Sequence, residues 1–139
     1  MARIRIELPE QFIFSTKIAI RITDINYGGH VGNDTILTLI HEARVQFLKH
    51  FGYEELNVEG TSLIMSDAAI EFKNELFYGD TITAFVIANN FSRVGFDLVY
   101  KLTRNDTSVA HAKTGMICYD YKQKKVVSLP DTAKEKLFM

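Results

Sequence analysis

The residues best suited to chemistry lie in a short polar segment at positions 24–33. It reads Asp-Ile-Asn-Tyr-Gly-Gly-His-Val-Gly-Asn and combines one acid, two amides, three glycines and one histidine. Adjacent glycines let the backbone approach a ligand closely. Backbone N–H groups at the start of a helix have no partner within that helix and point outward. The segment therefore predicts a ligand-binding loop that leads into a helix.

Three polar side chains of this segment are candidates for catalysis. His30 can donate, accept or exchange a proton near neutral pH, although a single loop histidine can also be purely structural. Asn26 cannot act as a nucleophile or general base, but it can orient a water molecule, hydrogen-bond a carbonyl group or simply form a turn. Asp24 either supplies a carboxylate to the site or holds the loop as an Asx-turn residue.

The backbone of the same segment offers a second kind of interaction. The N–H groups of Gly28, Gly29 and Val31 are candidate donors to a developing oxyanion, a contribution of about 3–4 kcal/mol to transition-state stabilisation. The alternative is a tight turn in which glycine supplies a positive φ angle. Both interpretations can hold together.

Other candidates lie outside the loop. On a helical wheel Glu42 is nearly opposite the apolar face, so a solvated or partner-facing position is favoured over a catalytic one. Asp67 interrupts an apolar strand, where it either lines the pocket mouth of a neighbouring subunit or marks a β-bulge. Arg93 and Lys73 are candidates for binding phosphate groups.

The remaining histidines and the single cysteine predict no metal site and no further nucleophile. His41, His50 and His111 are too scattered in the sequence to form a metal-binding motif. Cys118 is expected to be a small core residue rather than a nucleophile. With only one cysteine an intrachain disulfide is impossible, which fits a reducing compartment. We expect neither a metal nor a cofactor.

One long helix is predicted to follow the polar segment. Asn33 is the expected N-cap residue, and apolar residues recur at helical spacing from Ile36 to Phe51. Gly52 is the expected residue just beyond the helix. This gives a helix of about five turns. One of its faces is so apolar that a broad surface must cover it.

Alternating patterns predict the strands that provide this cover. Strands are expected at 12–22, 61–72, 81–88, 96–102 and 109–121, with a short edge strand at 3–8 and a terminal helix after Pro130. Short connections make sequential strands antiparallel. We predict a single α+β domain over residues 1–139, with a five- to six-stranded antiparallel sheet wrapped around one central helix. Its open edges favour a homodimer or a larger symmetric assembly.

The composition excludes several classes of protein. Hydrophobic residues make up 47% of the chain and the net charge is −1. No basic patch suggests nucleic acid as a partner, and no apolar run is long enough to cross a membrane. Charged residues at positions 3, 5 and 7 lie where a signal peptide needs an apolar block, so a cytoplasmic location is expected.

The polar segment also resembles a known family. The match begins with Asp24-x-Asn26-x-x-Gly29-His30-Val31-x-Asn33 and continues with Glu42-Ala43-Arg44, Tyr78-Gly79-Asp80-Thr81 and Leu129-Pro130. This pattern resembles the 4-hydroxybenzoyl-CoA thioesterase family of hotdog-fold acyl-CoA thioesterases over residues 14–137. The resemblance implies a hotdog fold and a dimer whose two sheets join edge to edge. It also implies active sites at the interface and hydrolysis of an acyl thioester carried by coenzyme A or acyl carrier protein.

The chain departs from the family at the position of the catalytic acid. Many members carry a carboxylate where this chain has Asn26, and Gly32 replaces one amide of the usual Val-Asn-Asn. We predict an acyl-CoA thioesterase that hydrolyses a fatty or aromatic acyl thioester at a dimer interface. Water would be held by Asn26 and His30 and activated by Asp24 or Glu42. The alternatives are a hotdog dehydratase and a non-hydrolytic acyl-thioester binding module.

Overall fold

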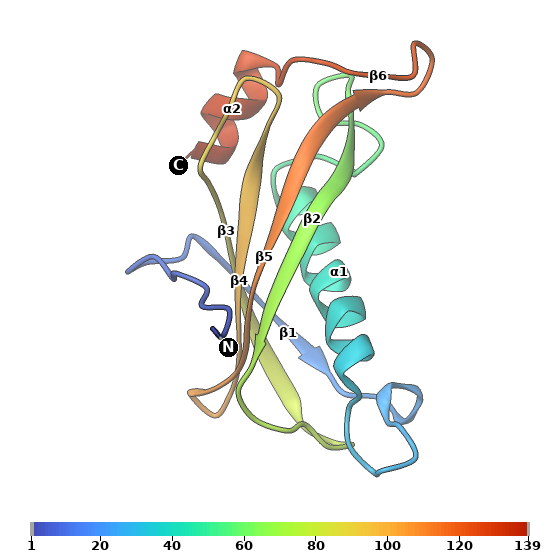
Figure 1. Ribbon diagram of the computed structural model, residues 1–139, viewed down its shortest axis with the longest axis vertical. Coiled ribbons are helices and arrows are strands. Elements are labelled where there is room, and N and C mark those ends of the chain that lie inside the picture. The colour runs from blue at the N-terminus through green and yellow to red at the C-terminus, as the bar shows by residue number, and fades with distance from the viewer. Residues whose placement is uncertain (1, 139) are drawn as a thin grey trace.

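The computed structural model describes residues 2–138 as one antiparallel sheet with a long helix packed along it (Figure 1). The elements are β1 Phe14–Ala19, the 3-10 turn η1 Ile22–Asp24, α1 Asn33–His50, β2 Ser62–Phe72, β3 Thr81–Asn89, β4 Gly95–Arg104, β5 Thr107–Asp120, β6 Lys125–Val126 and α2 Asp131–Phe138. The sheet has six strands in the order β1-β3-β4-β5-β2, with β6 paired to β5. All pairings are antiparallel, so the predicted architecture is confirmed.

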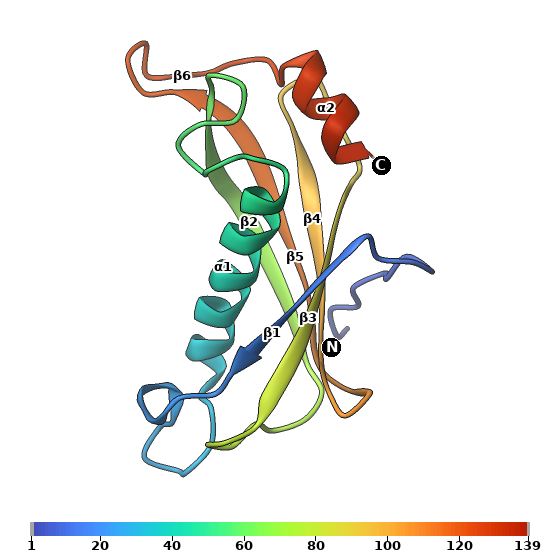
Figure 2. The same cartoon turned by 180° about the vertical axis from the view of Figure 1, so that it is seen from behind.

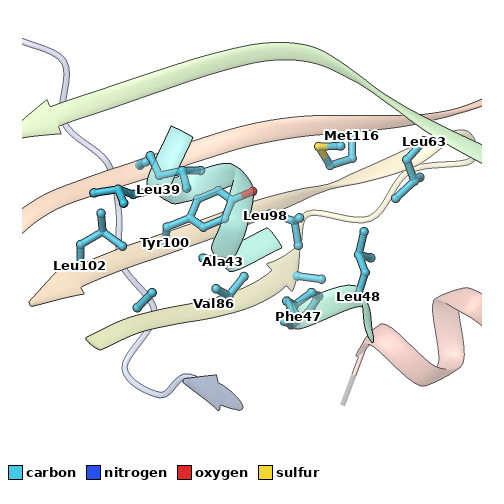
Figure 3. Packing of buried hydrophobic residues seen from close by; sticks show 14 of the residues in the cluster. Leu39, Ala43, Phe47, Leu48, Leu63, Val86, Leu98, Tyr100, Leu102 and Met116 are labelled. Carbon is cyan, nitrogen blue, oxygen red and sulfur yellow. The ribbon is translucent and has the colours of Figure 1, made fainter. Parts of the chain in front are cut away.

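The core lies between α1 and one face of the sheet. The helix and the N-terminal segment lie on opposite faces, as the front and back views show (Figures 1 and 2). Figure 3 shows Leu39, Ala43 and Phe47 of α1 among side chains from the strands. All three are almost completely buried, and burying one large apolar side chain contributes about 1.5–3 kcal/mol. The predicted apolar helix face is therefore confirmed as the centre of the core.

The two ends of α1 differ in how well the sequence predicts them. At the C-terminal end, Gly52 has φ +82° and its N–H donates to the Lys49 carbonyl (2.9 Å), while the Tyr53 N–H donates to Leu48 (2.9 Å). This is a Schellman motif and confirms the predicted glycine. At the N-terminal end the predicted Asn33 cap is wrong. The N-cap is Gly32, in extended conformation, and Asn33 is the first helical residue.

Two strand predictions need correction at the N-terminus. The strand expected over 12–22 is confined to Phe14–Ala19, because the chain turns into η1 after Arg21. Residues 3–8 form no edge strand. They cross the outer face of the sheet instead, where the Ile6 N–H donates to Glu71 Oε1 (2.7 Å), and Phe12, just beyond them, contacts Phe85. Their alternation of charged and apolar residues reflects contact with that face rather than strand pairing.

Strand β2 forms one edge of the sheet and contains an irregularity. Its pairing with β5 shifts between Met65 and Asp67, so Asp67 does mark a β-bulge, one of the two predicted readings. The strand has 11 residues, and within residues 2–138 its second edge has no partner strand. No helix among the described residues is long and apolar enough to cross a membrane.

Candidate active site

The turn before α1 fixes the start of the polar segment. Asp24 is buried, with 4% of its surface exposed, and its carboxylate accepts hydrogen bonds from the Arg21 N–H (2.8 Å) and from Arg21 Nη2 (3.4 Å). These bonds close η1. In this arrangement Asp24 holds the loop, and its carboxylate is directed back at the chain that precedes it.

Asn26 and His30 come together on either side of Gly28. Asn26 Oδ1 accepts the Gly28 N–H at 2.9 Å. A Cβ atom built on Gly28 would lie 3.2 Å from Asn26 Oδ1 and 3.6 Å from His30 Nε2. The loop is closed at its base by the Asn26 N–H, which donates to the His30 carbonyl (2.9 Å). The structure thus brings the two predicted side chains to one small region of the surface.

The ring of His30 is oriented by its neighbour. Nδ1 lies 3.0 Å from the Val31 carbonyl oxygen. Because a carbonyl oxygen can only accept, Nδ1 carries the proton in the neutral ring, and Nε2 is left as the acceptor. A half-buried imidazole held in this tautomer can take a proton from a bound water molecule.

The three predicted oxyanion donors are engaged within the chain. The Gly28 N–H donates to Asn26 Oδ1, the Gly29 N–H to the Asn26 carbonyl (3.1 Å) and the Val31 N–H to the Leu76 carbonyl (2.8 Å). The geometry therefore supports the turn reading for Gly28 and for Gly29, which has φ +83°, while the Val31 N–H ties the loop to a distant segment.

The start of α1 provides other N–H groups. The first helical hydrogen bonds are donated by Thr35 and Ile36, both to the Gly32 carbonyl (3.0 and 3.3 Å). The N–H groups of Asn33 and Asp34 precede these bonds and point out of the helix end. Their positive helix-end potential favours a developing negative charge nearby.

A groove of about 210 Å³ lies beside this helix end. His30, Val31, Asn33 and Ile36 form one wall, and residues 72–76 form the other. The second wall is tied to the loop by the Val31–Leu76 hydrogen bond. Its far end is fixed by Asp80, which accepts from the Phe77 N–H (2.9 Å) and from Arg104 Nη1 (2.9 Å). These two interactions hold the pKa of the Asp80 carboxyl below its usual value.

Glu42 lies in a different groove. This larger groove, of about 470 Å³, runs between β1 and the outward face of α1 and contains Lys17, Arg21 and Thr38. It shares no lining residue with the groove at His30. Glu42 is exposed and accepts a hydrogen bond from Gln46, as the solvated reading of this residue predicts.

Comparison of the sequence with models of known protein families identifies the family of this chain. The model of the thioesterase-like superfamily matches residues 20–137, which include the loop, α1 and the whole sheet after β1. The chain belongs to the thioesterase-like superfamily. This confirms the family resemblance of the loop and helix motif.

Individual relatives agree with this assignment. The chain is 30% identical to a 1,4-dihydroxy-2-naphthoyl-CoA hydrolase of Microcystis aeruginosa over 121 residues, which cover 83% of this chain and 86% of the relative. A 1,4-dihydroxy-2-naphthoyl-CoA thioesterase from Synechocystis superposes with a TM-score of 0.81 at 20% identity, over 90% of this chain and 95% of that one. A thioesterase from Thermus thermophilus, complexed with coenzyme A and Zn, gives 0.79 at 16% identity, over 93% and 100%. The two structures confirm the predicted hotdog fold.

Two predicted site residues of this thioesterase-superfamily chain lie away from the loop. Asp67 is on β2, where its Oδ1 accepts from Lys113 Nζ (2.8 Å) and from the Gly115 N–H (3.0 Å). The hydrogen bond from Lys113 lowers the pKa of Asp67. Arg93 is in the β3–β4 turn, at the opposite end of the molecule from the loop (Figure 1), and donates to Ser128 Oγ (3.3 Å). Within one chain neither residue reaches the groove at His30.

A polar network inside the superfamily fold was missed in the sequence. Arg44 is 6% exposed and donates to Glu55 Oε2 (3.2 Å) and to the Tyr100 hydroxyl (3.3 Å), which lies 2.7 Å from Thr114 Oγ1. Burial lowers the pKa of Arg44, but Tyr100 and Glu55 outweigh it and the net pKa is raised. The helical wheel offered the signal, because Arg44 lies on the side of Ile40 and Leu48. Its hydrogen bonds are made inside the fold, away from the groove at His30.

Cysteine and metal chemistry add nothing to the candidate site. Cys118 is fully buried, as predicted for a core residue, and burial raises the pKa of its thiol. Among residues 2–138, no three histidine, cysteine or acidic side chains are close enough together to hold a metal ion.

Proposed function

We propose that this chain hydrolyses acyl-CoA thioesters in the groove at the N-terminal end of α1. The observation that carries the proposal is the His30 ring, whose Nδ1 proton is committed to the Val31 carbonyl while Nε2 is left as an acceptor beside Asn26. The chain belongs to the thioesterase-like superfamily, so the reaction proposed for this imidazole is thioester hydrolysis. The proposed reaction needs no metal and no cofactor other than the CoA of its substrate.

The proposed reaction uses water as the nucleophile. Asn26 and His30 hold the water, and Nε2 of His30 takes its proton as the oxygen attacks the thioester carbon. The N–H groups at the start of α1, on Asn33 and Asp34, stabilise the oxyanion that forms. The C–S bond then breaks, the CoA thiolate leaves, and the imidazolium returns the proton to sulfur. The products are a carboxylic acid and free CoA.

In this scheme neither Asp24 nor Glu42 activates the water. Asp24 directs its carboxylate at Arg21, and Glu42 lines another groove. An imidazole base also explains how a chain with an amide at position 26 can remain a hydrolase. The site therefore replaces the carboxylate expected from the family resemblance with a histidine.

The acyl group is proposed to be aromatic or fatty. The groove wall contains Val31, Ile36, Phe72 and Leu76, which suit an apolar acyl group. The relative from Microcystis aeruginosa is named for a bicyclic aromatic acyl-CoA, so aromatic thioesters belong in the first panel of substrates.

We further propose a homodimer formed through β2. This strand has 11 residues and an unpaired edge among the described residues, and pairing with a second copy would satisfy its backbone groups. Phe72, at the end of β2, lines the groove at His30. A partner paired along β2 would therefore lie next to the groove and complete it. Sedimentation would separate this dimer from a tetramer of paired dimers and from a monomer.

Release of free thiol from a panel of acyl-CoA substrates tests the proposed activity. The panel would contain straight-chain acyl groups of several lengths, benzoyl-CoA and 1,4-dihydroxy-2-naphthoyl-CoA. Turnover that disappears with His30→Gln supports the proposal. Tight binding of acyl-CoA without turnover would instead make the chain a binding module, and formation of an enoyl thioester would make it a dehydratase.

A further inference from the structure

A second hollow lies next to the groove at His30 but on the outer face of the sheet. It has a volume of about 320 Å³ and is formed where the N-terminal segment crosses β2 and β5. Its lining residues are Arg3, Arg5, Ile6, Glu71, Lys73 and His111. Figures 1 and 2 show the N-terminal segment on the face of the sheet opposite α1. We call this hollow the outer pocket.

The charge in the outer pocket is mainly positive. Arg3, Arg5 and Lys73 contribute three cations, and Glu71 contributes the one carboxylate. Glu71 is already engaged, since it accepts from the Ile6 N–H (2.7 Å) and pairs with Lys73 Nζ (3.2 Å). The two arginines are exposed, and neither is needed to neutralise Glu71. The pocket therefore has guanidinium groups available for an anion.

The pKa of His111 is affected by the same positive charges. Its Nε2 lies 2.8 Å from Ser108 Oγ. The pKa of His111 is lowered by burial first and then by the nearby charges of Lys73 and Lys101, while Glu71 acts in the opposite direction. Lys101 is directly opposite His111 in the β4–β5 ladder. A fourth cation thus stands beside the pocket.

The outer pocket and the groove at His30 share one lining residue. Lys73 lines both of them, and it follows directly after Phe72 at the end of β2. The two hollows therefore lie next to each other at the end of this strand. This places a cationic site beside an apolar site for an acyl group.

We propose that the outer pocket binds the phosphate-rich nucleotide end of coenzyme A. This inference rests on the proposed function, because it treats the groove at His30 as the site of the thioester. Arginine suits phosphate through bidentate hydrogen bonds, and Arg3 and Arg5 provide two such groups beside the Lys73 ammonium. The pocket favours a CoA thioester over the matching acyl-pantetheine, which has no phosphate group. Within one chain the outer pocket, and not Arg93, lies beside the groove at His30.

Calorimetric titration with free CoA tests this pocket without requiring catalysis. The triple variant Arg3→Gln/Arg5→Gln/Lys73→Gln is expected to bind CoA at least tenfold more weakly than the unmodified chain. Binding of pantetheine, which lacks phosphate, is expected to weaken far less than binding of CoA. The matched control is Lys122→Gln/Lys124→Gln/Lys125→Gln, which removes the same charge from the exposed β5–β6 turn and the first residue of β6 and is expected to bind CoA normally.

Three binding results would overturn the proposal. They are unchanged CoA binding in the triple variant, equal weakening in both triple variants, and strong weakening by Arg93→Gln alone. Kinetics with a matched acyl-CoA and acyl-pantetheine pair separate this proposal from the proposed function. If neither thioester is hydrolysed although CoA binding depends on the three cations, the proposed function fails and the pocket stands. If both thioesters are hydrolysed and the triple variant has the same KM for acyl-CoA as the unmodified chain, the pocket assignment fails and the function stands.

Discussion

Two of the grooves beside α1 differ in size and in the groups they present. The groove along β1 is the larger, about 470 Å³ against about 210 Å³, and it contains a carboxylate, Glu42, near Lys17 and Arg21. The groove at the helix start contains an imidazole with an acceptor nitrogen, helix-end N–H groups and an apolar wall. Volume alone would favour the first of these two grooves. The chemistry of water attack on a thioester selects the second.

Filling each groove with a bulky side chain should separate them most clearly. Asn33→Trp at the helix start is expected to reduce kcat/KM for an acyl-CoA by about 100-fold, because it displaces the thioester from its attack geometry. Thr38→Trp fills the larger groove and serves as the matched control, with little expected change. Both positions are exposed, so thermal unfolding should be nearly unaffected. The opposite pattern of activities would transfer the reaction to the groove of Glu42.

The connection that walls the smaller groove should depend on Asp80. Asp80→Asn removes a charged partner from the Phe77 N–H and from Arg104, and should destabilise the fold at pH 7 by about 1–2 kcal/mol. Because folding lowers the pKa of Asp80, its contribution is present above the ordinary carboxyl pKa and is lost as the pH falls through the lowered value.

Urea unfolding at several pH values measures this contribution. The difference between the unmodified chain and the variant should shrink in acid. Asp106→Asn, in the exposed β4–β5 turn, is the control and should show no such difference. A difference that persists undiminished at low pH would contradict the role given to the Asp80 carboxylate.

Asp24 should matter for the fold of the loop more than for the reaction. Asp24→Asn weakens the closure of η1 at Arg21 and is expected to cost about 1 kcal/mol of stability. Thiol-release assays should show kcat within about threefold of the unmodified chain, since the group that takes the proton is elsewhere. A collapse of kcat in a well-folded Asp24→Asn protein would make Asp24 the activating acid.

The smallest effect is expected at the position where the family usually has an acid. Asn26→Asp keeps Oδ1 as the acceptor for the Gly28 N–H, so the stability should change by less than about 0.5 kcal/mol. Activity should be kept or raised, because the new carboxylate can also orient water. The measurement is kcat for the best acyl-CoA of the panel. A large loss would show that Nδ2 of the amide has a specific role.

Much of the fold could be predicted because local patterns and tertiary packing agree. The apolar stripe of α1 and the turn at Gly52 both follow rules that operate within a few residues. The Asp67 bulge could be suspected from a polar residue in an apolar strand. The helix start could not be predicted in the same way. Gly32 is the N-cap in extended conformation, with φ −71° and ψ 155°, and the better capping residue Asn33 is already the first residue of the helix.

The candidate site was only partly visible in the sequence. The spacing of Asn26 and His30 identified the loop, but it could not show that three of its N–H groups are used inside the chain. The spacing also could not show that Glu42 and His30 lie in different grooves, because these grooves form only when the chain is folded. The outer pocket depends on a segment that crosses the sheet, and its alternating residues resembled a strand.

The most direct measurement compares kcat for His30→Gln and Glu42→Gln on the acyl-CoA that the unmodified chain hydrolyses fastest. We expect a loss of about 100-fold or more for His30→Gln and a value within about threefold of normal for Glu42→Gln. Circular dichroism and thermal melts would show that both variants are folded. Normal turnover by His30→Gln together with a large loss in Glu42→Gln would contradict the proposed mechanism and place the reaction in the larger groove.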